Sequence, residues 1–422
     1  MRNAMNRSSL IKEQTKGDIF FTVLMSMIWA DSILMRYIRV GIQMIPHIWK
    51  HADMIISLMY LIMFFLSLGE MLRSVYMKEI LYLIMMYVVF LLYFYLVPAN
   101  KGYFYNSGIT ISKVFPMFMI GICAYRISRD RIVKALYGIS IITVFFFAFY
   151  RMMNIASDQR LMMSGDMHGA YSILPHICLV FAGFIKKPRP LNGCTFSVGV
   201  LILLFLGNRG SLLCLGVFIV VTILFSGRLK RPWLFLLLSA IVMMILFFFG
   251  LLDLLYNVAE EHGFSLRIFQ KLESGEIADS SGRNRIHQRV WEYILRYPML
   301  GLGIFSDRQV AGGYYAHNIV LEVLIHYGIG IGSALLGLVA YLLIFSYKYL
   351  RQEKRPELDL FGALVFSYGF KLLMSSSYLL EPYFFFTLGF ACAIINERNQ
   401  ALRIERRRRD RKGLVRFRRI KV

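Results

Sequence analysis

The chain has 422 residues, 58% of them apolar, and a mean hydropathy of +0.58. This composition excludes an ordinary soluble enzyme or binding domain and favours a protein that lies in a membrane. Its 48 Lys and Arg residues outnumber its 25 Asp and Glu residues, which gives a formal net charge of +23.

Apolar stretches of the length that a helix needs to cross a bilayer recur along the chain. They predict about twelve transmembrane helices, centred near Leu24, Met63, Tyr87, Met117, Val144, Cys178, Val200, Ile219, Ile241, Leu338, Phe366 and Phe386. The stretches near Met117, Val200 and Phe386 are short or interrupted, so about ten or eleven spans stay possible. We therefore expect an all-α, polytopic helical membrane protein with one membrane domain over residues 1–422.

The basic residues predict the orientation of this domain. With the N-terminus inside, about two-thirds of the 48 Lys and Arg residues fall on the cytoplasmic side. Both termini are then cytoplasmic, and residues 253–315 form a long loop on the outer face, periplasmic or extracellular. The basic tail over residues 397–422 is interpreted as a flank held at anionic lipid headgroups, so no nucleic-acid partner is expected.

The cysteines suggest neither a disulfide framework nor a metal site. Four of them lie in apolar spans and Cys194 lies near an inner edge, and no Cys/His spacing typical of zinc sites is present.

Arg209 stands in a very short outer turn, in the sequence Gly207-Asn208-Arg209-Gly210-Ser211. An arginine at a membrane boundary often only extends towards the headgroups. Here it lies on the face that the positive-inside rule depletes of arginine, and the flanking Gly210 would let a ligand approach the backbone. This turn is a candidate anion-binding site.

The outer loop contains an arginine-rich amphipathic segment. Arg283, Arg285, Arg289 and Arg296 alternate with apolar residues in a pattern that predicts a helix suited to the membrane surface. Solvated side chains are the simplest interpretation of the last three, although Arg285 is kept as a candidate for substrate binding. Arg283 follows Gly282 at the start of the segment, where an ordinary cation at a helix start is the simplest interpretation from the residues alone.

His317 and Asn318 stand where the chain enters the next apolar stretch. A histidine at a helix start is usually a cap or a solvated side chain. Its ordinary pKa, near 6.5, nevertheless makes it a natural proton acceptor at neutral pH. His287 and His326 have no comparable context, and His326 is expected to be a packed or surface residue. Lys371 and Glu322 lie in predicted spans and could form a pair there.

These features together resemble the O-antigen ligase and polymerase family of polytopic membrane glycosyltransferases. The matching elements are the Arg209 turn, Gly282-Arg283, the turn Pro298-Met299-Leu300-Gly301-Leu302-Gly303, and His317-Asn318. The chain departs from the family pattern at Asn208, where a serine is typical. It departs again after Gly328, where the family's second glycine is displaced to Gly330 and Gly332.

The resemblance implies a metal-independent glycosyltransferase of the bacterial cytoplasmic (inner) membrane, with no cofactor. Its donor would be an undecaprenyl-diphosphate-linked glycan and its acceptor a hydroxyl of a second glycan, with other polysaccharide-assembly proteins as further partners. Arg209, Arg283 and His317 would be catalytic, and Asn318, Gly282, Gly210 and Arg285 would bind substrate.

These residues do not identify the acceptor substrate. The modest loop and the disturbed glycine spacing favour a polymerase that joins oligosaccharide repeat units into surface polysaccharide. A ligase that transfers the glycan to lipid A-core or to protein is the alternative. A flippase or other transporter of lipid-linked glycans is a second alternative, but such proteins show internal repeats and charged central cavities.

Overall fold

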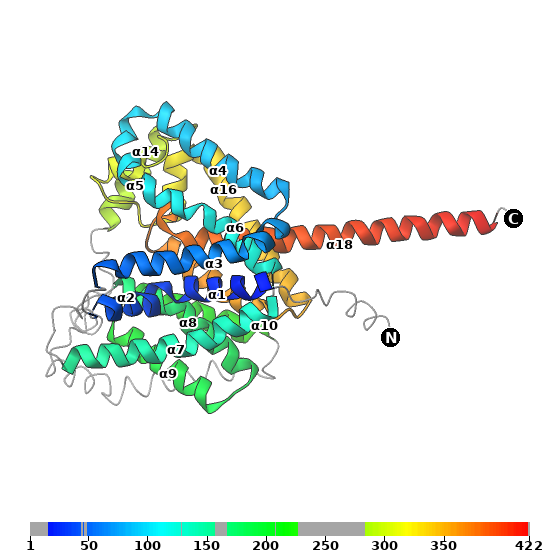
Figure 1. The fold of residues 1–422 in the computed structure, drawn as a ribbon. Coiled ribbons are helices and arrows are strands. Elements are labelled where there is room, and N and C mark those ends of the chain that lie inside the picture. The colour runs from blue at the N-terminus through cyan, green and yellow to red at the C-terminus, as the bar shows by residue number, and fades with distance from the viewer. Residues whose placement is uncertain are drawn as a thin grey trace.

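The fold was analysed in a computed structural model, which describes residues 16–43, 45, 49–127, 129–156, 167–206, 208–226 and 283–420. Within these ranges every regular element is a helix (Figure 1). The elements up to residue 156 are α1 (Lys16–Ala30), η2 (Asp31–Met35), α2 (Arg36–Gln43), η3 (Trp49–His51), α3 (Ala52–Ser74), α4 (Met77–Leu96), η4 (Pro98–Asn100), α5 (Lys101–Val114), α6 (Pro116–Arg126) and α7 (Arg129–Ala156).

The remaining elements contain the residues singled out from the sequence. They are α8 (Met167–Lys186), α9 (Pro190–Phe205), α10 (Arg209–Ser226), α14 (Arg283–Arg296), α15 (Ser306–Val310), α16 (Ile319–Gln352), α17 (Leu358–Leu364), η7 (Val365–Gly369), η8 (Phe370–Leu373), η9 (Tyr378–Leu380) and α18 (Pro382–Ile420).

The all-α, multi-pass class is confirmed, whereas the count of twelve spans is not. Six helices in the described ranges are long and apolar enough to cross a membrane: Lys16–Gln43, Ala52–Ser74, Met77–Leu96, Arg129–Arg151, His168–Lys186 and Ile319–Gln352. Two shorter apolar helices are Pro190–Leu204 and Arg209–Phe225. Every predicted span centre falls in a helical segment except Ile241, which lies outside the described residues.

Some predicted spans are shorter than a full crossing because the chain breaks within them. The stretch around Met117 is divided between α5 and α6 at Pro116, which has no backbone N–H to continue a helix. The stretch around Phe366 passes through η7 and η8 and ends before Ser375, Ser376 and Ser377. Non-helical backbone at this depth needs hydrogen-bond partners from the protein around it.

Two glycines bring α6 and α18 into backbone contact. A Cβ built on Gly121 would lie 2.0 Å from the carbonyl oxygen of Phe386, and one built on Gly389 would lie 1.9 Å from that of Phe118. Small residues at such crossings are the usual means of close packing between membrane helices, because lipid offers no hydrophobic driving force for helix association. Beyond this contact, α18 continues as a basic helix that projects from the other helices, on the side opposite α14 (Figure 1).

The glycine-rich turn after α14 supports a break in α16. Gly328 has φ 78° and ψ 171°, so the helix is interrupted there. The N–H of Ile329 donates to the Pro298 carbonyl at 2.7 Å, and those of Leu302 and Gly303 donate to the carbonyls of Ile325 and His326 at 2.8 and 3.0 Å. The turn therefore bonds with backbone groups that the break leaves without partners inside the helix.

Candidate functional site

The Arg209 turn is built as a helix start. Asn208 accepts hydrogen bonds through Oδ1 from the N–H groups of Gly210 and Ser211, at 3.0 and 3.4 Å. Asparagine is a good N-cap residue, so Asn208 can cap this helix in place of the serine that is typical of the family. Gly210 lies directly against Tyr171 of α8, because a Cβ built on this glycine would be 2.0 Å from the tyrosine Oη.

Arg283 is the first residue of α14, which forms over the arginine-rich segment. The helix buries Val290 and Ile294 and leaves Arg285 exposed. Arg283 Nη1 donates to the carbonyl oxygen of Met374 at 2.6 Å. Gly282, which precedes it, lies outside the described residues.

Asn318 caps the next helix and His317 stands just before it. The Asn318 side chain accepts from the N–H groups of Val320 and Leu321 at 2.9 and 3.3 Å and donates to the Leu373 carbonyl at 3.0 Å. His317 has a left-handed backbone, with φ 55°, and its ring lies 4.1 Å from that of Tyr315. The Nδ1 atom of His317 is buried and has no hydrogen-bond partner among the described residues.

The surroundings keep His317 neutral. Burial, the positive charge of Arg283 and the neighbouring His287 together lower the pKa of His317 to about 4, against the opposing effect of Asp307. Burial also lowers the pKa of His287. Neutral imidazole has a free ring nitrogen, so His317 can accept a proton throughout the physiological pH range.

Predicted residues from two separate parts of the sequence contact one short segment, residues 373–375, and a third part lies one residue away from it. Leu373 accepts from Asn318 and Met374 accepts from Arg283. Ser375 forms a side-chain hydrogen bond with Tyr171, the residue against which Gly210 packs. The broken span between η8 and η9 is thus the common support for the Arg209 turn, α14 and the start of α16.

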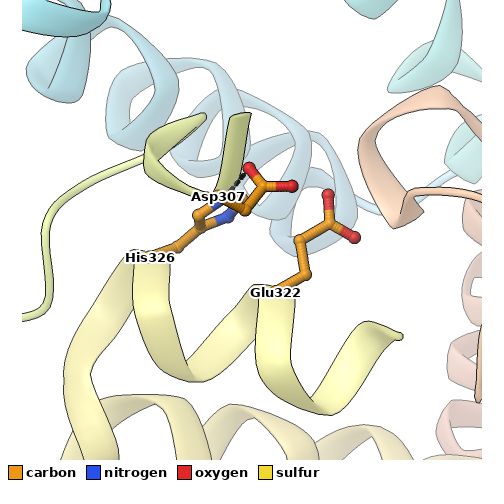
Figure 2. A group of neighbouring side chains, drawn as sticks. All are labelled: Asp307, Glu322 and His326. Carbon is orange, nitrogen blue, oxygen red and sulfur yellow. Dashed lines mark hydrogen bonds and ion pairs between the residues drawn. The ribbon is translucent and has the colours of Figure 1, made fainter. Parts of the chain in front are cut away.

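A buried polar cluster lies beside this support (Figure 2). Glu322 and His326 are one helical turn apart on α16 and point towards Asp307 of α15, and His326 Nε2 is 2.9 Å from Asp307 Oδ1. Glu322 accepts from the Ser377 hydroxyl and from the N–H of Tyr378. All three charged or titratable residues are fully buried.

The same three residues are spaced closely enough to hold a metal ion, since one potential ligand atom from each lies within 4.8 Å of the others. The contacts favour a different interpretation. Arg308 Nη1 lies 3.6 Å from Asp307 Oδ1 and brings a positive charge to the cluster. Burial would raise the pKa of Asp307, but its hydrogen bond with His326 and the charges of His326 and Arg308 hold it below the ordinary value. We therefore interpret the cluster as an internally paired network.

The structure decides one pairing that the sequence left open and places one histidine to which the sequence assigned no role. Lys371 does not pair with Glu322; it forms an ion pair with Glu381, while Glu322 binds Ser377 and Tyr378. His287, for which the sequence offered no role, lies beside His317. Of the two alternatives for His326, a packed or a surface residue, its complete burial selects the packed one.

Other residues of the site carried little or no sequence signal. Tyr171 lies in an unremarkable apolar stretch, and only its position in space connects it with Gly210. Asp307 and Arg308 follow the glycine-rich turn, where two adjacent charges that become buried could have attracted notice. The run of three serines at 375–377 was the clearest missed signal, because it places polar side chains inside an apolar stretch.

Comparison with known proteins gives a family match over this part of the chain. A family model described as O-antigen ligase matches residues 194–342, which include Arg209, Arg283 and His317. A search of curated proteins finds no match to the chain. The family match confirms the resemblance drawn from the sequence motifs.

Proposed function

Residues 194–342 carry the O-antigen ligase family domain, and on that premise we propose that the protein polymerises lipid-linked oligosaccharide repeat units into surface polysaccharide. The family supports a membrane glycosyltransferase of the ligase or polymerase type. The donor would be a glycan on undecaprenyl diphosphate and the acceptor a hydroxyl of a second glycan. The observation that carries the proposal is that Arg283 and the start of α16 both bond to residues 373–375, to which Tyr171 links the Arg209 turn.

In this proposal the two arginines bind the donor diphosphate. The acceptor hydroxyl oxygen bonds to the anomeric carbon while the bond from that carbon to the phosphate oxygen breaks. Negative charge then accumulates on the departing diphosphate, where guanidinium groups stabilise it. Arginine suits this task because it is always charged and can donate two parallel hydrogen bonds to one phosphate.

His317 would accept the proton that leaves the acceptor hydroxyl. Its buried Nδ1 has no partner among the described residues, and its lowered pKa keeps the ring neutral. Asn318 and Gly210 would shape the site, and Arg285, which is exposed on α14, would contact the glycan. Gly282 remains a candidate from its place in the sequence alone.

The test uses purified protein in lipid nanodiscs with an undecaprenyl-diphosphate-linked oligosaccharide. Elongated glycan and free undecaprenyl diphosphate should appear together, and they should still appear in the presence of a chelator. A transporter would release no undecaprenyl diphosphate. Offering lipid A-core as a second acceptor separates the two enzymes, since transfer to it alone would show a ligase and overturn polymerisation.

The roles of the arginines are tested by substitution. Arg209→Ala and Arg283→Ala should each reduce transfer by about 10²–10³-fold, the usual cost of removing one charge-stabilising donor. Arg→Lys should recover little of the loss, because lysine has no planar fork. Exposed Arg289 on α14 offers a matched control, and Arg289→Ala should leave transfer unchanged. Full activity in both the Arg209 and the Arg283 variant would contradict diphosphate binding by these residues.

A further inference from the structure

Ala316, the residue before His317, is held on both sides of its backbone. Its N–H donates to Asp307 Oδ2 at 3.0 Å, and its carbonyl oxygen accepts from His287 Nε2 at 3.0 Å. The two partners come from different elements, Asp307 from α15 and His287 from α14. Ala316 itself is completely buried, so these contacts are protected from exchange with water.

These contacts define where His317 stands. Its φ of 55° lies in the left-handed region, which residues other than glycine rarely adopt and keep only when neighbouring contacts enforce it. The peptide before His317 is fixed through Ala316. The residue after it, Asn318, is fixed because its side chain caps α16. The imidazole is therefore presented from a backbone that is anchored at both ends.

Both partners of Ala316 are themselves constrained. A carbonyl oxygen only accepts, so His287 Nε2 must carry the proton in this contact. Asp307 is fixed in turn by His326, at 2.9 Å (Figure 2). It also lies beside Arg308. The buried cluster is thus connected with the candidate site by hydrogen bonds, since Asp307 bonds to Ala316, the residue before His317.

We infer that His287 and Asp307 are positioning residues for transfer, acting through Ala316 to hold His317 in its left-handed conformation at the acceptor. The inference rests on the proposed function of His317. Neither residue touches the reacting atoms in this arrangement, and each acts on the rate by placing the imidazole. A displacement of that ring by about 1 Å is enough to slow a reaction by about 10²-fold.

His287 offers the cleaner test, because it is only partly buried on the surface of α14. His287→Leu removes the donor to Ala316 and should lower kcat by about 10–100-fold while the KM for the donor stays the same. His287→Gln retains an N–H group that can reach the carbonyl and should recover most of the rate. Gln288→Leu is the matched control, since Gln288 is exposed on the same helix and bonds only with Glu292 in the described structure.

A double-mutant cycle with His317→Ala distinguishes positioning from an independent role. If His287 acts only through His317, then His287→Leu should cause no further loss in the His317→Ala background. Multiplied losses in the double variant would overturn the inference, and so would a His287→Gln variant as slow as His287→Leu. Full transfer by His317→Ala would instead refute the role proposed for His317, which is a separate result.

Discussion

The Tyr171 hydroxyl lies against the backbone of Gly210, at a place where a Cβ on the glycine would be 2.0 Å from the oxygen. Tyr171 is buried in α8 and also bonds with Ser375, so it joins the start of α10 to the broken span. The position of Arg209 therefore depends on a contact made by its neighbour with a residue far away in the sequence.

Gly210→Ala should reduce transfer by at least about 10-fold, because the new methyl group displaces either Tyr171 or the turn that holds Arg209. Tyr171→Phe removes the clashing oxygen and leaves Cζ, 3.2 Å from the same Cβ, as the next nearest atom of that ring. The double variant should therefore regain activity. Gly216→Ala is the control on the same helix, since nothing lies within 4 Å of its Cβ. A double variant no more active than Gly210→Ala would refute this explanation.

The pH dependence of transfer should reflect the lowered pKa of His317. Burial and the charge of Arg283 lower this pKa to about 4, so the imidazole stays neutral well below pH 6.5. Protonation abolishes a general base, and transfer should therefore stay constant through mildly acidic pH and fall only as the pH approaches 4. Initial rates at saturating donor give the profile. A midpoint near 6.5 would mean that His317 is solvated during turnover, or that another group is the base.

The break in α16 should make two nearby glycines respond oppositely to alanine. Gly328 has φ 78°, and a Cβ there would lie 2.3 Å from the Met299 carbonyl oxygen, so Gly328→Ala should destabilise the fold by about 1–3 kcal/mol. Gly330 has no atom within 4 Å of its Cβ, and Gly330→Ala should stabilise the helix by about 0.5–1 kcal/mol. Thermal unfolding in detergent compares the two Tm values. Equal shifts would argue against a fixed break at Gly328.

Both termini are predicted to be cytoplasmic, from the excess of basic residues on the inner segments. In the structure, α14 and the projecting part of α18 lie on opposite sides of the molecule (Figure 1). A reporter active only in the cytoplasm should work when fused at Val422 and fail when inserted near Asp279. Activity of a periplasmic reporter fused at Val422 would show that the orientation is the inverse of the predicted one.

Several features follow from the sequence because they depend on neighbouring residues. The apolar stretches marked the helices, since a segment of that length and composition is stable in lipid only when its backbone bonds internally. The helix that begins at Arg283 is also local, and its amphipathic pattern was visible in the sequence. The glycines of the turn at 298–303 were recognisable as a motif, although their partners on α16 were not.

The tertiary structure decided which of these features meet. Lys371 and Glu322 both lie in apolar stretches, yet one pairs with Glu381 and the other with Ser377, because helix rotation determines which buried groups face each other. In the same way, His287 reaches Ala316 only because α14 packs beside the start of α16. Sequence established the helices and the chemistry of individual side chains. Packing established residues 373–375 as their common support, since contacts over such separations depend on the whole fold.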